Sequence, residues 1–289
     1  MEIKVFNREK KSIYIEKQFK DKQLNFLYNN FLGRILLKLF ISNKIFSKLS
    51  AISNKSKKSI NKINPFIKEY EIDISEFEKV NYNSFDDFFT RKIIKDKRPI
   101  TMSKNALISV ADSKLSTYKI DNNLELNIKG TTYSIKSLLK DEYLSNEYKN
   151  GTCLVFRLTV DDYHRYCFLD NGSIISKRKI NGCLHTVGPM SAKYKVYSEN
   201  NREYALLKTK NFDEVIQIEI GALLVGRIIN HNLNTFKKGE EKGYFAFGGS
   251  TIVLLFKENI ITIDNDIIEK SKEGIETKVK LGEKIGEKL

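Results

Sequence analysis

The sequence predicts an α+β fold, with a helical, basic N-terminal region over residues 1–75 and a predominantly antiparallel β body over residues 76–289. Apolar residues recur at helical spacing in the first region. After residue 150 their period falls towards two, and several of these segments are separated by Gly or Asn turn signals. Because 41% of the 289 residues are hydrophobic, the chain can build a large core, which excludes a disordered or fibrous protein.

The N-terminal region concentrates positive charge. The whole chain carries a formal net charge of +14, and the segment from Lys22 to Lys68 has ten basic residues and no acidic one. An apolar stripe recurs there at helical intervals from Leu24 to Ile52. Such a stripe suits either an anionic lipid surface or the core of the protein, and the pattern alone leaves both open. Nucleic acid is a poor candidate partner, because Lys far outnumbers Arg, the usual reader of bases.

Two helices and seven strands are expected after this region. Ser84 begins a short helix with a capping box that includes Asp87, and a longer helix runs from Ser134 to Asn150, where Gly151 ends it. The expected strands cover residues 152–158, 174–180, 214–220, 223–229, 244–247, 251–256 and 260–263.

Several classes of site and location are not expected. No apolar run approaches the ~20 residues of a membrane-spanning helix, and the first residues do not form a secretory signal. The three cysteines, Cys153, Cys167 and Cys183, lack Cys-x-x-Cys spacing, so we expect a reducing interior and no metal site. The glycine-rich motifs that bind nucleotides are absent from the sequence.

Ser250 is the first candidate for chemistry, because it follows Gly248 and Gly249 between two β-like segments. Consecutive glycines permit unusual backbone conformations and close approach of neighbouring groups. The Ser250 hydroxyl can then be held against the carbonyl of Gly249, where oriented groups reach effective molarities of ~10⁵ M or more. The alternative is an inert serine beside a glycine bulge. A hydrolase elbow is excluded, since Ile252 occupies the place of its second glycine.

Two histidines and one aspartate are further candidates. His164 follows an expected strand, and His185 precedes a Val-Gly-Pro segment. Imidazole is the side chain best suited to accept and return protons near neutral pH. Asp112 ends an apolar stretch and is well placed to orient a histidine. Each also has an ordinary interpretation, as a surface histidine or a turn-forming aspartate.

Taken in this order, the segments resemble the bacterial, membrane-associated form of the phosphatidylserine decarboxylase family. The segments that carry the resemblance are Phe85–Arg91 with Arg98–Ile100, Ala111-Asp112, Lys129-Gly130 with Tyr133-Ser134, Asp162–Arg165, Gly221-Ala222, Val225-Gly226, Lys238–Phe245 and Phe247–Thr251. The most specific part is the Lys-Gly-Glu-Glu block together with Gly-Gly-Ser-Thr, and the similarity extends over nearly the whole chain.

The resemblance implies a self-processing enzyme whose cofactor is a pyruvoyl group, a covalently held pyruvate made from Ser250. Ser250 would attack the carbonyl of Gly249, dividing the chain into residues 1–249 and 250–289, while Asp112 orients the histidine that acts as base. The pyruvoyl group would form a Schiff base with phosphatidylserine and accept electrons as carbon dioxide leaves. The product would be phosphatidylethanolamine.

Two positions depart from the family pattern. His164 resembles the first histidine of the family, implicated in handling the substrate and the proton added after decarboxylation. The usual second histidine, three residues later, is Cys167 here, and a thiol with a pKa of ~8.5 is a poor base. The processing base is therefore either His164 or His185. Ser113 stands where the family commonly has glycine, which we interpret as a tolerated change in a turn.

A lipid substrate favours the membrane interpretation of the N-terminal region. The expectation is a peripheral protein on the cytoplasmic face of the cell membrane, bound to anionic lipid, with its large and small chains as partners. The oligomeric state stays open, and a homodimer is one candidate. Two alternatives remain: a pyruvoyl-dependent decarboxylase of another amine, and an uncut, non-enzymatic relative that binds acidic membranes, which Cys167 favours.

Overall fold

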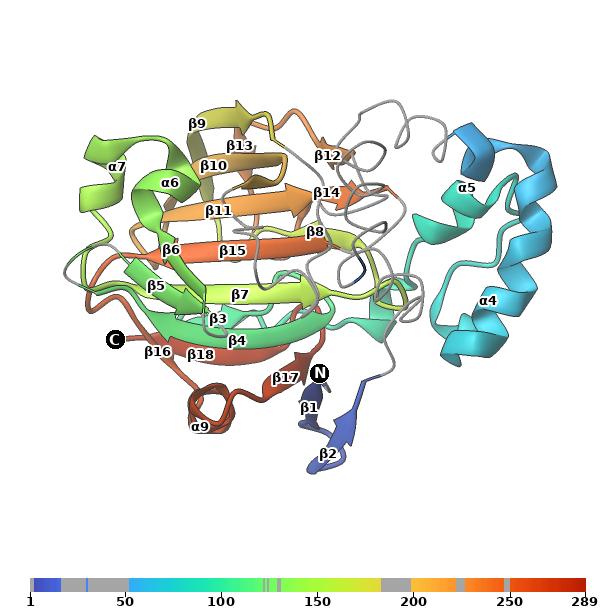
Figure 1. Ribbon diagram of the computed structural model, residues 1–289, viewed down its shortest axis with the longest axis horizontal. Helices are drawn as coiled ribbons and strands as arrows, with labels where there is room; N and C mark the ends of the chain where they lie inside the picture. The colour runs from blue at the N-terminus through green and yellow to red at the C-terminus, as the bar shows by residue number, and fades with distance from the viewer. Residues whose placement is uncertain are drawn as a thin grey trace.

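The computed structural model describes residues 3–16, 30, 52–121, 123, 125–128, 131–182, 199–221, 227–246 and 250–289. Strands dominate this part of the chain, and the largest sheet runs across the whole molecule (Figure 1). Every strand pairing in the described ranges is antiparallel except that of β1 with β17. The α+β class is confirmed.

The large sheet has ten strands. In spatial order they are β13 (Thr235–Phe236), β9 (Gly172–Ile180), β10 (Arg202–Thr209), β11 (Glu214–Gly221), β15 (Ser250–Phe256), β7 (Thr152–Leu158), β4 (Ser113–Lys119), β17 (Glu276–Val279), β1 (Lys4–Asn7) and β2 (Ser12–Ile15). Three smaller sheets contain β12 (Ile228–Asn230), β14 (Glu241–Phe245) and β8 (Arg165–Cys167); β16 (Ile261–Ile263), β18 (Lys284–Lys288) and β3 (Ala106–Ile108); and β5 (Glu125–Ile128) with β6 (Thr131–Ser134).

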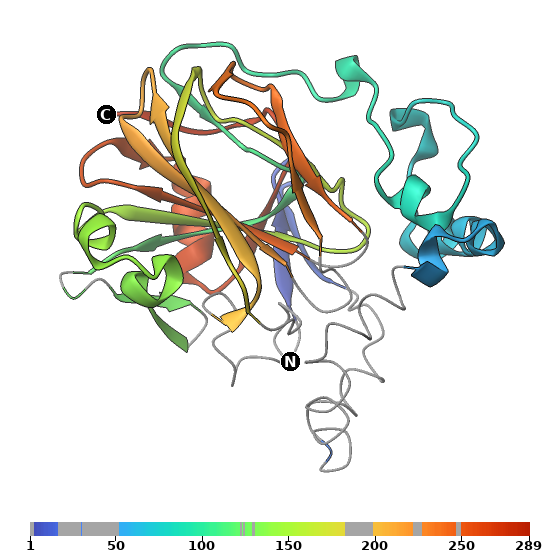
Figure 2. The same ribbon diagram turned by 90° about the horizontal axis from the view of Figure 1, so that it is seen from above.

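Helices lie around these sheets. Among the α-helices are α4 (Ile63–Tyr70), α5 (Phe85–Phe89), α6 (Ile135–Leu139), α7 (Glu142–Asn146) and α9 (Asn265–Lys272), and among the 3-10 helices are η2 (Lys57–Lys62), η3 (Ile74–Glu76) and η4 (Lys95–Lys97). Seen from above, α4 and α5 stand to one side of the β body (Figure 2). We call residues 52–94, which contain them, the helical lobe.

The middle of the large sheet is buried on both faces. Along β15, Ile252 and Leu254 belong to one core, which also contains residues of the β12-β14-β8 sheet and of the β16-β18-β3 sheet. Val253 and Leu255 point to the other face and belong to a second core, which lies under α6 and α7. Every residue of β15 is consequently buried. This two-sided burial explains why the strand reads in the sequence as one continuous apolar run.

The helical lobe has its own small core. It is formed by Ile63, Phe66, Phe85, Phe88 and Phe89 and is joined by Val160 from the β body. The expected capping of α5 is confirmed, since the Asp87 amide donates to Ser84 Oγ at 3.1 Å. Because Val160 lies in the loop that follows β7, this small core connects the helical lobe to that loop.

Two expectations about helices were wrong. Within the region of residues 1–75, expected to be helical, the segments Lys4–Asn7 and Ser12–Ile15 form a hairpin that extends the large sheet through β17. The helix expected from Ser134 to Asn150 is two helices, because Lys140 adopts a left-handed conformation (φ 50°) and Asp141 caps α7 by accepting from the Leu144 amide. Of residues 24–52, which contain the expected apolar stripe, only Asn30 and Ile52 are described. The stripe from Leu24 to Leu49 therefore lies outside the described residues.

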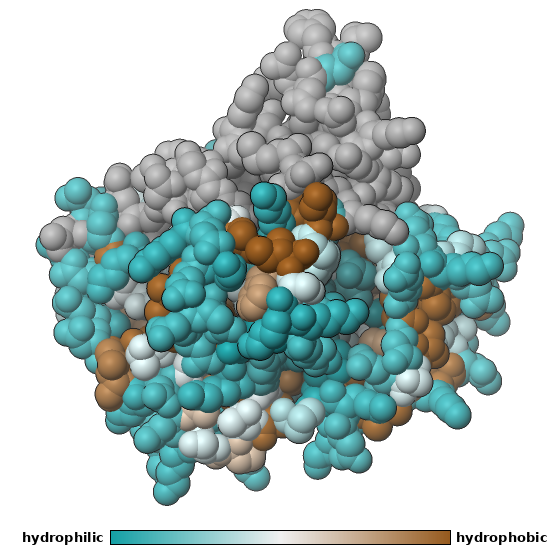
Figure 3. All heavy atoms as spheres, turned by 90° about the horizontal axis from the view of Figure 1, so that it is seen from below, coloured by the Kyte–Doolittle hydropathy of each residue, from teal (hydrophilic) through white to brown (hydrophobic). Residues whose placement is uncertain are grey.

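Each expected strand overlaps an observed one in the described ranges, but eleven of the strands observed there, among them β4 and β17 of the large sheet, were not expected. Of the expected strand 223–229, residues 223–226 lie outside the described residues, and β12 overlaps its end. β7 has the predicted bounds, and β9, β11, β14, β15 and β16 overlap the expected ranges. The surface seen from below is mainly hydrophilic over the described residues, with small hydrophobic groups (Figure 3). Among the described residues, no helix is both long and apolar enough to cross a bilayer.

Candidate active site around Ser250

Ser250 is the first residue of β15, in the middle of the large sheet. It pairs with Gly221 on β11 and with Leu158 on β7. Its side chain is fully buried, and Oγ has no hydrogen-bond partner among the described residues. Buried hydroxyls are normally hydrogen-bonded, so an unpartnered one deserves a functional explanation. Pairing with β11 and β7 therefore holds Ser250 in the sheet, directly after the peptide bond at which the sequence predicts the cut.

The loop of residues 159–164 lies beside the same stretch of chain. It starts after Leu158, which pairs with Ser250, and it ends at His164, whose carbonyl accepts from the Phe245 amide at 3.0 Å. Both ends of the loop thus contact the chain just before and at Ser250. His164 is buried, and its ring packs on the ring of Phe89 with centroids 4.2 Å apart.

The hydrogen bond made by His164 defines its tautomer. Nδ1 lies 2.9 Å from the carbonyl oxygen of Asp162. A carbonyl only accepts, so Nδ1 carries the proton, and in the neutral ring the lone pair is on Nε2. This is the form of imidazole that can remove a proton from a hydroxyl.

The loop is anchored through the carboxylate of Asp162. It accepts from the Thr159 amide at 2.7 Å and from Lys114 Nζ at 2.7 Å. Lys114 is opposite Arg157 in the β4–β7 ladder, so the loop is attached to the sheet one register position from Leu158. Burial raises the pKa of Asp162 to about 6, even with Lys114 beside it.

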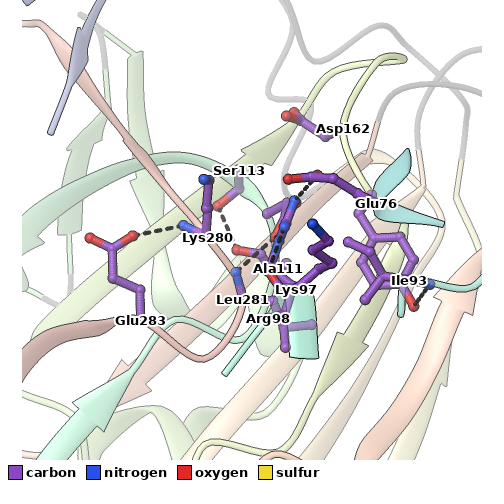
Figure 4. Close-up of polar contacts among 12 residues, drawn as sticks. Glu76, Ile93, Lys97, Arg98, Ala111, Ser113, Asp162, Lys280, Leu281 and Glu283 are labelled. Atoms are coloured by element: carbon purple, nitrogen blue, oxygen red, sulfur yellow. Dashed lines mark hydrogen bonds and ion pairs between the residues drawn. The ribbon is translucent and has the colours of Figure 1, made fainter. Parts of the chain in front are cut away.

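Asp112 lies at the same end of the sheet, next to the start of β4, but its carboxylate is occupied by an arginine. Arg98 Nε is 2.9 and 3.0 Å from the two oxygens, and the Leu281 amide donates to Oδ1 at 2.8 Å. Arg98 also reaches Glu76 at 3.0 Å (Figure 4). These described contacts include no histidine, so the orienting role of Asp112 remains a prediction.

Cys167, at the position of the second family histidine, lies close to Asp112 along the backbone. Its amide donates to the carbonyl of Val110 at 2.9 Å. The side chain is 1% exposed, and burial raises the pKa of the thiol to about 12. A thiol that stays protonated at neutral pH is neither a base nor a nucleophile.

Two predicted site residues cannot be compared with the structure, and one histidine near the site was not predicted. His185 and Gly249 lie outside the described residues. His231, the third histidine of the chain, was not singled out from the sequence. Its Nε2 lies 2.7 Å from Glu241, which Arg165 also contacts at 2.8 Å. This shared carboxylate connects His231 to Arg165, the neighbour of His164, a link that sequence spacing does not reveal.

Comparison with known proteins assigns the chain to a family. The family model described as phosphatidylserine decarboxylase matches residues 85–287, which is well over half of the chain and includes all the described site residues. The chain belongs to the phosphatidylserine decarboxylase family. As a member of this family it is a decarboxylase.

Relatives match over their full lengths. Phosphatidylserine decarboxylase proenzyme 2 of Clostridium acetobutylicum is 66% identical over 288 residues, covering 99% of each chain. The phosphatidylserine decarboxylase proenzyme of Clostridium botulinum is 46% identical over 296 residues, again covering 99% of each. That of Clostridium perfringens is 42% identical over 293 residues, covering 99% of this chain and 100% of the relative.

Family membership gives the arrangement at Ser250 a chemical meaning. The names of these relatives describe proenzymes, which are precursors that become active after processing. In this chain a buried hydroxyl follows a double glycine in the sequence, and the segment that flanks it carries an imidazole whose Nδ1 donates to the Asp162 carbonyl. A hydroxyl, a base and an adjacent peptide carbonyl are the groups that an attack on the backbone requires.

Proposed function

We propose that this chain is a phosphatidylserine decarboxylase that makes its own pyruvoyl group by cutting between Gly249 and Ser250. The observation that carries the proposal is the Ser250 hydroxyl, which is buried and has no partner in the described part of the chain. The 66% identity to a phosphatidylserine decarboxylase proenzyme over 99% of both chains supports the same substrate and the same precursor state.

The cut begins with an exchange of bonds at residue 249. Ser250 Oγ attacks the Gly249 carbonyl carbon, its proton passes through the base to the departing nitrogen, and the peptide bond is replaced by an ester. Removal of the Cα proton of residue 250 then breaks the Cβ–Oγ bond and releases the Gly249 carboxylate. The remaining enamine becomes an imine, and water replaces its nitrogen, which leaves as ammonia. Residue 250 is then a pyruvoyl group.

The pyruvoyl group would supply a carbonyl that condenses with the substrate amine and takes up the electrons released with carbon dioxide. The chain's own residues would bind and orient the lipid and move protons. His164 would move protons through Nε2, because Nδ1 is committed to the Asp162 carbonyl. Asp112 would orient whichever histidine serves the cut.

Histidine substitutions identify the processing base. His164→Gln and His185→Gln proteins are followed on denaturing gels for the 249/250 cut, with Ser250→Ala as the control that stays one chain. Normal cutting in the His185→Gln protein would exclude His185, and normal cutting in the His164→Gln protein would exclude His164. Intact mass should show a small chain that begins with a pyruvoyl group.

The proposal as a whole depends on two measurements. Freshly purified protein should contain two chains, and it should release carbon dioxide from phosphatidylserine. A single continuous chain that consumes no hydroxylamine and releases no carbon dioxide would overturn the proposal. Release from free L-serine or another soluble amine, but not from the lipid, would instead identify a decarboxylase of another substrate.

Membrane association is proposed for part of residues 1–75. Its support is the excess of ten basic residues without an acidic one between Lys22 and Lys68, which suits the anionic cytoplasmic face of a membrane. Because residues 4–15 belong to the large sheet, the informative deletion removes residues 17–51 only. Sedimentation with anionic liposomes should be lost in that protein, whereas unchanged binding would contradict the assignment.

A further inference from the structure

Arg91 is a buried cation that no acidic side chain neutralises in the described part of the chain. It follows α5 in the helical lobe and is 2% exposed. Its guanidinium lies over the ring of Phe77 at 4.3 Å and over that of Phe88 at 4.8 Å. Nη1 reaches the Phe88 carbonyl at 3.4 Å, while Nε and Nη2 are buried without a hydrogen-bond partner.

The two unpartnered nitrogens form one edge of the guanidinium. This edge presents two parallel N–H donors, the arrangement with which arginine binds carboxylate or phosphate. Two other arginines of the chain use the same edge in this way. Arg98 binds Asp112 through Nε and Nη2, and Arg157 binds Glu276 through the same pair of atoms. In Arg91 the edge meets no anion among the described residues, and a buried charge without a counter-ion is costly.

The edge belongs to the neighbourhood of the candidate active site. Phe89, two residues before Arg91, packs on the His164 ring, and the Thr90 carbonyl accepts from Arg165 Nη2 at 2.8 Å. The Tyr163 ring contacts Phe77, whose other neighbour is the Arg91 guanidinium. The helical lobe therefore brings Arg91 against the loop that carries His164.

The surroundings of Arg91 are aromatic. The rings of Phe77 and Phe88 both contact its guanidinium, and Tyr163 and Tyr82 pack on those rings. Burial lowers the pKa of Arg91 to about 10, so the side chain keeps its charge at neutral pH. A cation framed by apolar rings suits an anion that is itself attached to apolar groups, as in a phospholipid headgroup.

We infer that Arg91 binds the phosphodiester of the substrate headgroup, a role that rests on the proposed function. Phosphatidylserine carries two anions, its phosphate and its carboxylate. The carboxylate loses its charge as carbon dioxide leaves, so an ion pair with it would stabilise the starting state and slow the reaction. The phosphate keeps its charge throughout and is bound equally before and during the chemical step.

The test compares two short-chain lipids that share the phosphate and differ in the carboxylate. Carbon dioxide release from dihexanoyl phosphatidylserine gives KM and kcat, and inhibition by dihexanoyl phosphatidylethanolamine gives Ki. In the Arg91→Gln enzyme both KM and Ki should rise roughly 10- to 100-fold, because two charge-assisted hydrogen bonds are lost. The kcat value should stay within about threefold, since the interaction is the same before and during the reaction. Arg178→Gln, at an exposed arginine of β9, is the matched control and should change neither constant.

Two outcomes would overturn the inference. An unchanged KM would remove Arg91 from substrate binding, and a rise in KM without a rise in Ki would assign it to the carboxylate. If Arg91→Gln does not fold, the wild-type enzyme is labelled with phenylglyoxal and the Arg91 adduct is measured by mass. Dihexanoyl phosphatidylethanolamine should slow this labelling, and unchanged labelling counts against the inference. A wild-type enzyme that releases no carbon dioxide contradicts the proposed function instead, and the labelling experiment still reports on phosphate binding.

Discussion

Cys167 occupies the position of a family histidine, and burial decides what its thiol can do. The pKa is raised to about 12 because the thiolate would be desolvated, so at pH 8 the group is a neutral, small apolar side chain. We therefore predict that Cys167→Ala protein cuts between 249 and 250 to the same extent as the parent chain. The loss of one buried sulfur should cost about 1 kcal/mol of unfolding free energy, measured in urea.

A labelling experiment checks the same point without a substitution. Iodoacetamide at pH 8 should modify neither Cys167 nor Cys153 in the folded protein, because burial raises the pKa of both thiols. Both should react once urea unfolds the chain. Rapid modification of Cys167 in the native protein would show a thiolate and reopen its role as a base.

Substitutions at the ion pair of Asp112 and Arg98 distinguish a structural role of Asp112 from a role in orienting a histidine. Asp112→Asn should lower the unfolding free energy by about 3 kcal/mol, because it leaves a buried arginine facing a neutral amide. Glu76→Gln, at the more exposed partner of Arg98, should cost only about 0.5 kcal/mol. Urea unfolding of the three proteins measures both differences.

Cutting in the same series tests the orienting role. If Asp112 holds the processing histidine, Asp112→Asn should cut far more slowly than Arg98→Gln, although both break the ion pair. Equal slowing in the two proteins would assign the effect to the ion pair and argue against orientation by Asp112.

At the scale of the elements, the N-terminal hairpin is connected to the site through a chain of ion pairs. Glu16, directly after β2, contacts Arg157 at 2.6 Å and Lys114 at 3.2 Å, and Lys114 holds Asp162 of the His164 loop. Glu16→Gln should therefore cost about 3 kcal/mol, because two buried cations lose a counter-ion. It should also slow the cut at 249/250, since the loop loses part of its anchor.

A matched substitution lies on the same hairpin. Glu9 pairs with Lys280 at 2.6 Å but is 67% exposed, so Glu9→Gln should change the unfolding free energy by at most about 0.5 kcal/mol. Urea midpoints and gel time courses of both proteins are compared. A Glu16→Gln protein as stable and as quickly cut as Glu9→Gln would show that the hairpin does not support the loop.

Elements differ in how clearly the sequence announces them. The apolar run of β7 was recognised with its correct bounds, because both faces of that strand are buried. β10 was missed, since it opens with a charged pair. Its Arg202 is buried because Nε donates to the Leu138 carbonyl at 2.7 Å and Nη2 to the Ser137 carbonyl at 2.9 Å. The Arg202 guanidinium therefore caps the C-terminal end of α6. Leu138 lies 64 residues away in the chain, so no local sequence pattern predicts this contact.

At the scale of the whole molecule, the proposed cut falls inside an interlocked sheet. Residues 250–289 contribute β15 between β11 and β7, and β17 between β4 and β1. The apolar side chains Ile252 to Phe256 are all buried, and their burial is worth about 10 kcal/mol. The two chains produced by the cut should therefore remain one particle.

Native gel filtration after complete cutting measures this association. Both chains should elute together at low denaturant concentration and separate only where the protein unfolds. The uncut Ser250→Ala protein, which keeps the covalent link, is the control for elution volume. Early release of the small chain in native buffer would contradict the interlocked topology.

The sequence by itself determined the fold class, part of the strands of the β body and the serine at which the chain is proposed to cut, because alternation, capping and the Gly-Gly-Ser-Thr motif are local signals. Tertiary structure alone decided that residues 4–15 join the sheet, that Arg98 binds the carboxylate of Asp112, and that Arg91 is buried without an ion-pair partner among the described residues. These features depend on contacts between residues far apart in the chain. The energy of a buried charge is set by which partner the fold brings to it, and spacing along the sequence carries no record of that partner.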